Sequence, residues 1–161
     1  MPRLARFLTW TGAVGVAASA ALHVLSLFGR AQLVGGAVPL LFFGLAVLMP
    51  LWAVLWAAHA KRNGVGTWDK QAQNTLAADV FDALPRRREL TLWVALAYGL
   101  LWFVLFPIGI APPGASLAAF FGFFYLLVAL VSPLLAEKAA PPFSRRRYNS
   151  PLQADRGRQR S

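Results

Sequence analysis

The chain has 161 residues, of which 58% are hydrophobic and only 14% are charged. Ordinary soluble domains hold roughly 45–50% and about 25% of these classes, so the composition excludes a typical soluble domain. The formal net charge is +10, and the six acidic residues all lie outside the long apolar runs. The chain has no cysteine, which excludes disulfides, zinc–thiolate sites, iron–sulfur clusters and thiol catalysis.

Four apolar stretches are long enough to cross a bilayer, because about 20 helical residues span the roughly 30 Å hydrocarbon layer. They cover residues 7–28, 37–60, 89–111 and 115–136. The second span is expected to begin near Pro39, since proline suits a first helical turn. Short segments rich in turn residues join the first span to the second and the third to the fourth. The sequence therefore predicts an all-α integral membrane protein with four transmembrane helices in two helical hairpins.

The Lys and Arg residues indicate the orientation of these spans. Of the 16, only Arg30 lies in a predicted hairpin turn, and the others lie in the N-terminal stub, the loop 61–88 and the tail 137–161. Cytoplasmic segments of membrane proteins retain positive charge. We therefore expect both termini and the long loop to be cytoplasmic, in a multi-pass protein of a bacterial plasma (inner) membrane. The richness in Ala, Leu and Arg suits a GC-rich bacterial genome.

The N-terminus allows one alternative reading. Arg3 and Arg6, an apolar run and the small residues Ala18-Ser19-Ala20 resemble a cleavable signal peptide, and cleavage would leave three spans. The apolar run continues to Phe28, which is full spanning length. This favours a retained first span.

The long loop contains one amphipathic segment, residues 68–84. Apolar residues recur every four positions, and polar residues cover the other side, until Pro85 ends the pattern. The apolar positions are Trp68, Ala72, Leu76, Val80 and Leu84. We predict a helix on the cytoplasmic surface of the bilayer. Docking of this helix on a partner protein is an alternative.

Basic clusters flank the spans. We divide the chain into a transmembrane domain, 1–136, and a basic tail, 137–161, whose small number of large apolar residues predicts disorder. The residues predicted to contact anionic lipid headgroups are Arg86, Arg87, Arg88, Arg145, Arg146 and Arg147. The tail has no aromatic or fold-level signal for nucleic acid, so we do not expect nucleic-acid binding.

Small and polar residues at helical spacing predict where the spans pack together, because helices in lipid associate through close packing and polar contacts. One such stripe lies on the first span, a shorter one on the third and another on the fourth. The predicted helix-packing residues are Thr11, Gly15, Ser19, His23, Ala95, Gly99, Ala118, Gly122, Tyr125 and Ala129. We expect these stripes to face the inside of the helix bundle, and we favour this interpretation over a substrate path.

His23 is the one ionisable residue well inside a predicted span, and such residues are functional candidates. A hydrogen bond to a neighbouring helix is the favoured interpretation, and ligation of a haem-like or chlorin cofactor is a weaker one. His59 is expected at the opposite surface, roughly 20 Å or more away, as an interfacial residue. We therefore predict no bound cofactor, no metal site and no catalytic residues.

One segment resembles a known family. Gly66-Thr67-Trp68-Asp69-Lys70, followed by Asn74-Thr75-Leu76, is similar to the segment after a span in the RDD family of small bacterial membrane proteins. The first span lacks the paired aspartates that name that family. The resemblance implies no function for this chain.

The functional hypothesis is a non-enzymatic accessory or assembly subunit of a larger membrane complex. Its expected partners are the bilayer, anionic lipid headgroups, and another membrane protein or a second copy. One alternative is a small oligomeric transporter or channel, although no Asp or Glu lies inside a span beyond Glu89 at the first position of the third. A further alternative is an electron-transfer or light-harvesting subunit that binds its cofactor through His23.

Overall fold

The computed structural model describes residues 1–29, 31–66, 69–110 and 112–136, and only the backbone of residues 31–35. The described residues form five helices: α1 Pro2–Leu27, α2 Ala31–Arg62, α3 Lys70–Asp82, α4 Arg86–Leu105 and α5 Pro113–Ala136. All except α3 are long and apolar enough to cross a membrane. The protein is therefore an all-α, multi-pass membrane protein. The predicted tail, with Arg145, Arg146 and Arg147, lies outside the described residues.

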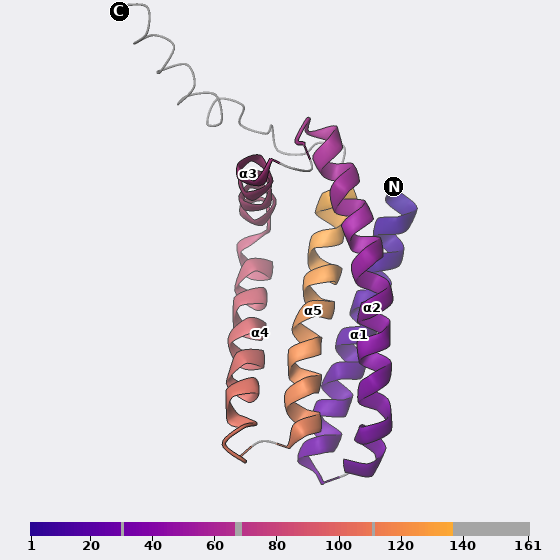
Figure 1. The fold of residues 1–161 in the computed structure, drawn as a ribbon, viewed down its shortest axis with the longest axis vertical. Coiled ribbons are helices and arrows are strands. Elements are labelled where there is room, and N and C mark those ends of the chain that lie inside the picture. Colours follow the sequence, from indigo (N-terminus) through magenta and orange to yellow (C-terminus); the bar gives the residue numbers. More distant parts are fainter. Residues whose placement is uncertain (30, 67–68, 111, 137–161) are drawn as a thin grey trace, which may run out of the picture.

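The four long helices stand side by side, and each runs antiparallel to the next along the chain (Figure 1). The α1–α2 and α4–α5 turns lie at one end of the bundle, and α3 lies at the other end, where its axis crosses the bundle axis (Figure 1). α5 contacts each of the other four helices. The last helix of the chain is thus the centre of the bundle.

Proline and glycine account for where the third span ends. α4 stops at Leu105, six residues before the expected limit of the span. Pro107 cannot donate a backbone hydrogen bond to the preceding turn. Gly109, with a φ of +75°, donates to Phe106 O at 3.0 Å, and Ile110 donates to Leu105 O at 3.2 Å. This pair of bonds is a Schellman motif, which satisfies carbonyls left open at the helix end.

All four long helices begin earlier than predicted, because they extend beyond the apolar runs, whereas α3 ends at Asp82, two residues before the predicted Leu84. α1 begins at Pro2 and α2 at Ala31, so Pro39 lies inside α2 and not in its first turn. An unbonded backbone group in lipid costs several kcal/mol, which favours continued helix over irregular chain at that depth. α5 begins at Pro113, two residues before the expected Ala115.

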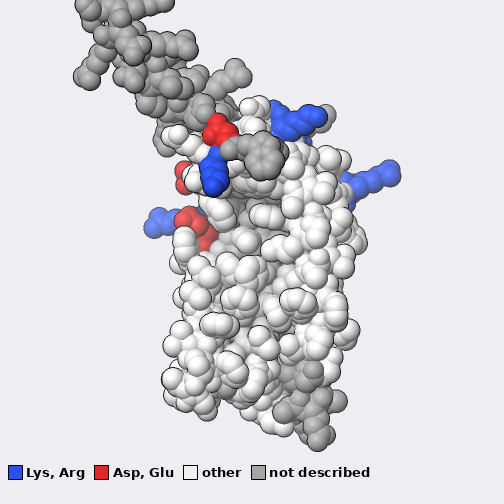
Figure 2. All heavy atoms as spheres, viewed as in Figure 1, with Lys and Arg blue, Asp and Glu red and all other residues white. Residues whose placement is uncertain are grey.

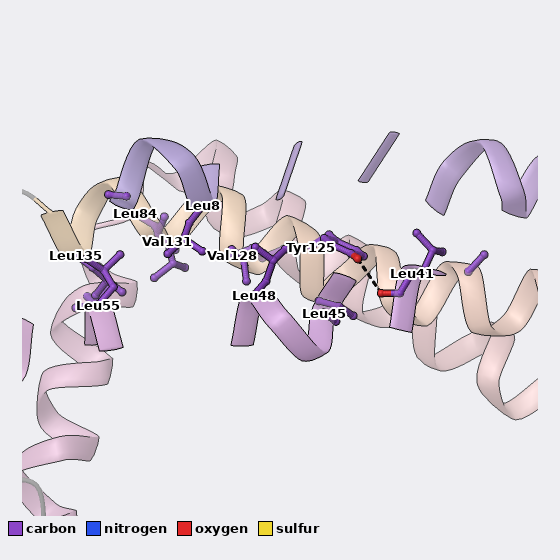
Figure 3. Packing of buried hydrophobic residues seen from close by; sticks show 14 residues of the cluster. Leu8, Leu41, Leu45, Leu48, Leu55, Leu84, Tyr125, Val128, Val131 and Leu135 are labelled. Atoms are coloured by element: carbon purple, nitrogen blue, oxygen red, sulfur yellow. Dashed lines mark hydrogen bonds between the residues drawn. The ribbon is translucent and has the colours of Figure 1, made fainter. Parts of the chain in front are cut away.

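Side chains of α1, α2, α4 and α5, together with Val80 and Leu84 at the α3 end, form one core along the bundle axis (Figure 3). The fully buried members include Leu8 on α1, Leu55 on α2, and Val128 and Leu135 on α5. In Figure 2, uncharged residues, drawn white, cover most of the bundle, and the described charged residues lie at the α3 end. Charge and apolar surface are thus separated along the long axis.

α3 is held in place at both its start and its apolar face. Asp69 caps the helix by accepting a 3.0 Å hydrogen bond from the Ala72 backbone N–H. Ala72 and Leu76 pack with Ala60 of α2 and with Val65. Trp56 Nε1 donates to Gln73 Oε1 at 2.9 Å, a side-chain link between α2 and α3. α3 therefore turns its apolar face to its own bundle; Trp68, predicted to share that face, lies outside the described residues.

Candidate functional site

The closest helix contact in the bundle is that between α1 and α5. Gly12 and Gly15 of α1 face Tyr125 and Ala129 of α5. A Cβ added at Gly15 would lie 2.0 Å from Tyr125 Cδ1, and one at Gly12 would lie 2.9 Å from the Ala129 backbone nitrogen. Both distances are below any real van der Waals contact, so this seam requires glycine at both positions.

Tyr125 joins α5 to two neighbours at once. Its ring lies over Gly15 of α1, and its hydroxyl reaches Gly44 of α2, where an added Cβ would lie 2.2 Å from the oxygen. The hydroxyl donates to Leu41 O at 2.7 Å (Figure 3). A buried phenol in an apolar bundle needs such a partner, because an unpaired polar group in lipid is costly.

The other predicted packing residues on α1 and α5 lie partly in this seam. Ser19 is buried against Gly122, whose added Cβ would lie 3.3 Å from Ser19 Cβ. Ala118 is fully buried in the core. The Thr11 hydroxyl donates to the Phe7 carbonyl of its own helix, at 2.5 Å.

α4 packs on α5 through Gly99. An added Cβ there would lie 3.4 Å from Ala119 O. Ala95 is half-buried beside it, one turn away. Among the described residues of α4, only Leu92 and Gly99 are buried, so α4 is the most exposed of the four long helices.

His23 connects three helices near the end of the bundle that holds the turns. Its Nδ1 lies 2.9 Å from the Ala115 carbonyl of α5, and its Nε2 lies 2.7 Å from the Tyr98 hydroxyl of α4. The Trp102 ring meets the imidazole edge to face, with centroids 4.7 Å apart. Only 7% of the His23 side chain is exposed. We call His23, Tyr98 and Trp102 the outer cluster.

The partners of His23 define its tautomer. A carbonyl oxygen can only accept, so Nδ1 carries the hydrogen and donates to Ala115 O. In the neutral ring Nε2 then accepts from the Tyr98 hydroxyl. Both ring nitrogens are engaged by the protein, and an axial bond to a cofactor metal would require Tyr98 to leave. The arrangement suits a structural bond between α1, α4 and α5.

The charged end of the bundle holds a second histidine contact. His59 of α2 is only 1% exposed, whereas the sequence placed it at the interface. Its Nδ1 donates to the Leu135 carbonyl at 3.2 Å, and the Arg62 guanidinium donates to the same oxygen. Carbonyls in the last turn of a helix lack intrahelical donors and carry partial negative charge. His59 and Arg62 thus close the end of α5, and His59 Nε2 is buried with no hydrogen-bond partner in the part of the chain that the structure describes.

A groove of about 790 Å³ runs between α1 and α2. Its floor is formed by the small residues Gly15 and Gly44 and by the Tyr125 ring, with Ala18 and Ala21 along one wall. Exposed bulky residues form its rims: Phe7, Val14, Leu40, Phe43 and Val47. The residues that line it include no charged side chain. We call this the α1–α2 groove.

A second, narrower opening lies between α1 and α4, over α5. One cavity of about 290 Å³ is lined by Val16, Ser19, His23 and Leu126 among others, and an adjoining one of about 350 Å³ shares Val16 and Leu126 and ends at Arg88. The His23–Tyr98 bond closes it at the outer cluster. We call this the α1–α4 crevice.

The predicted lipid-contacting residues that the structure describes are all accessible. Arg86, Arg87 and Arg88 form the first turn of α4 and are exposed at the charged end. Side chains of this length can reach a headgroup while their stems stay on apolar surface.

Several residues of these sites were not among those predicted from the sequence. Gly12, Tyr98 and Trp102 fall outside the predicted stripes, and the burial of His59 contradicts its placement among charged neighbours. Trp102 is the one tryptophan that the sequence places deep in a span, which is a signal for a partner inside the bundle.

Within the described ranges no group of three or more His, Asp or Glu residues could hold a metal ion. In comparisons with known proteins, no family model matches the chain, and neither does a curated protein or a solved structure.

Proposed function

We propose that this protein is a non-enzymatic accessory or assembly subunit of a larger complex in a bacterial plasma (inner) membrane. The observation that carries the proposal is the α1–α2 groove, which we take to receive one transmembrane helix of a partner membrane protein. Lipid tails are as apolar as leucine side chains, so helices in membranes associate through close packing and not through the hydrophobic effect. A groove with a glycine floor allows that packing.

The shape and lining of the groove support a helix as its occupant. The lining runs from Phe7 to Leu22 on α1, which at 1.5 Å per residue is about 22 Å, most of the roughly 30 Å layer. Tyr125 fills the space beside Gly15 and Gly44 on its floor, and the small residues Ala18 and Ala21 leave room for bulky side chains of a partner. Its floor is already fixed by the Tyr125–Leu41 bond, so little ordering would be needed on binding.

The proposal includes an orientation. We place the charged end, with α3, the N-terminus and the first turn of α4, in the cytoplasm. The described Lys and Arg residues gather there, and Lys and Arg are retained on the cytoplasmic side of membrane proteins (Figure 2). α3 would then lie along the inner leaflet, since its axis crosses the bundle axis (Figure 1). Its exposed Phe81 and the arginines Arg86, Arg87 and Arg88 would meet the headgroup region.

The two alternative functions have less support. A channel through a single chain would need a polar path along the axis, whereas the axis is occupied by α5 and by buried apolar side chains. A cofactor on His23 would have to displace the Tyr98 hydroxyl or the Ala115 carbonyl. A transporter formed by several copies remains the second candidate, because a second copy could occupy the same groove.

The absence of native cysteine makes a direct test possible. Ala21 is exposed and lines the α1–α2 groove, whereas Val104 is exposed on α4 and lies away from it. Ala21→Cys and Val104→Cys are to be treated with a short thiol-to-amine or photoactivated crosslinker in native membranes. We expect a discrete product between the chain and a different membrane protein from Ala21→Cys, but not from Val104→Cys.

A third variant shows whether the groove itself is responsible. Ala18→Phe fills the groove, and in the Ala21→Cys background it should abolish the product while the chain remains in the membrane. Products of equal yield from both cysteine positions would refute the proposal. A product containing only two copies of the chain would replace it with the oligomeric transporter.

A further inference from the structure

The α1–α4 crevice is continuous from the charged end to the outer cluster. Its cavity at Arg88 shares Thr9 and Pro133 with a third cavity of about 380 Å³, which is lined by Arg6 and Trp10. Arg6 on α1 and Arg88 on α4 therefore line two adjoining cavities at the charged end. α5 forms the floor below them.

The lining of the crevice changes from charged to apolar to polar along its length. Next to the two arginines and Thr9, it is formed by residues such as Ala13, Val16 and Leu126. Polar side chains return at Ser19, whose buried hydroxyl has no hydrogen-bond partner among the described residues, and at His23 and Tyr98. The apolar section thus runs over about ten residues of α1, from Thr9 to Ser19, or about 15 Å.

That length corresponds to one leaflet. The hydrocarbon layer is roughly 30 Å thick, so an acyl chain of one leaflet reaches about 15 Å from the headgroup level. Planar guanidinium groups match the geometry of phosphate oxygens and bind them through two parallel hydrogen bonds. The crevice has cations at one end, an apolar wall along its length and a closed far end, an order that fits a phospholipid better than a helix. The larger α1–α2 groove, whose lining is uncharged, suits a helix.

We propose that the α1–α4 crevice binds one anionic glycerophospholipid from the leaflet at the charged end. The phosphate lies between Arg6 and Arg88, and one acyl chain lies on α5 between Ala13 and Leu126. This inference rests on the proposed orientation of the charged end toward the inner leaflet, but not on a partner in the α1–α2 groove. The bound lipid would fill the space between α1 and α4, which the His23–Tyr98 hydrogen bond connects.

The test uses the full chain in phosphatidylcholine vesicles that contain a minor fraction of phosphatidylglycerol. After transfer to mild detergent, native mass spectrometry measures the ratio of phosphatidylglycerol-bound to free protein. The wild type should retain one phosphatidylglycerol molecule in preference to phosphatidylcholine. In the double variant Arg6→Ala/Arg88→Ala this ratio should fall roughly 30-fold, since each basic side chain near a membrane surface contributes about 1 kcal/mol.

Two matched controls separate the site from general charge and from misfolding. Arg3→Ala/Arg87→Ala removes the same charge from exposed residues outside the crevice and should leave the adduct unchanged. Ala13→Phe fills the crevice without a change in charge and should remove the adduct, whereas Ala17→Phe, on an exposed face of α1 away from the crevice, should not.

Equal losses in the two arginine pairs, or an adduct that survives Ala13→Phe, would overturn the lipid site. Equal retention of phosphatidylcholine would do the same, because it removes the role of the arginines. The crosslinking of Ala21→Cys is read separately. A lost crosslink with a retained adduct would overturn only the proposed function, and the reverse result only the lipid site.

Discussion

The hydrogen bond between His23 and Tyr98 gives the most direct test of the outer cluster. His23→Leu removes the bonds to Tyr98 and to the Ala115 carbonyl, and Tyr98→Phe removes the first of these alone. Interhelical hydrogen bonds in membranes average about 0.6 kcal/mol and reach about 1.7 kcal/mol. The 2.7 Å distance and the burial of His23 favour the upper part of that range.

We therefore expect Tyr98→Phe to lower the free energy of unfolding by about 1 kcal/mol and His23→Leu by about 2 kcal/mol. Ala115 lies in the first turn of α5, so its carbonyl can still accept a bond within the helix when His23 is lost. Tyr98 is 45% exposed, and its hydroxyl can turn to other partners. These two facts keep the cost of His23→Leu moderate.

The assay is a double-mutant cycle on unfolding in mixed detergent micelles. If the bond exists, the double variant should be less destabilised than the sum of the single variants, by about 1 kcal/mol. Additivity to within about 0.3 kcal/mol is the behaviour of independent sites. Such a result would refute the interpretation that His23 links α1 to α4.

Two further predictions concern packing and capping. Gly15→Ala should lower the free energy of unfolding by about 1–3 kcal/mol, because its Cβ would meet the Tyr125 ring at 2.0 Å. Gly36→Ala, which has no atom within 4 Å of the added Cβ, should be neutral. Equal melting temperatures for the two variants in detergent would contradict the α1–α5 seam. Asp69→Ala should destabilise α3 by about 1 kcal/mol and speed amide hydrogen exchange there, while Asp69→Asn should retain the cap. Equal exchange rates in the two variants would show that the hydrogen bond to the Ala72 N–H does not hold α3.

The contact residues were predicted with mixed results, for a physical reason. A stripe of small residues shows which face of a helix can approach another, and Gly15, Tyr125 and Ala129, which were predicted in this way, lie at the α1–α5 contact. Gly12 was missed because it lies on the same side of α1 but one position outside the four-residue spacing. The partner of each stripe could not be predicted, since spacing along one helix says nothing about which neighbour it meets.

The amino-acid sequence by itself determines the four spans, because bilayer thickness sets a length of apolar helix that the composition either meets or fails to meet. The Asp69 cap and the Schellman motif at Gly109 likewise depend on residues only a few positions apart. Only the tertiary structure decides that α5 occupies the centre, that His23 meets Tyr98 and Ala115, and that His59 is buried against Leu135. Those contacts join residues 75 or more positions apart, and in lipid they depend on close packing and paired polar groups, which a hydrophobicity pattern does not encode.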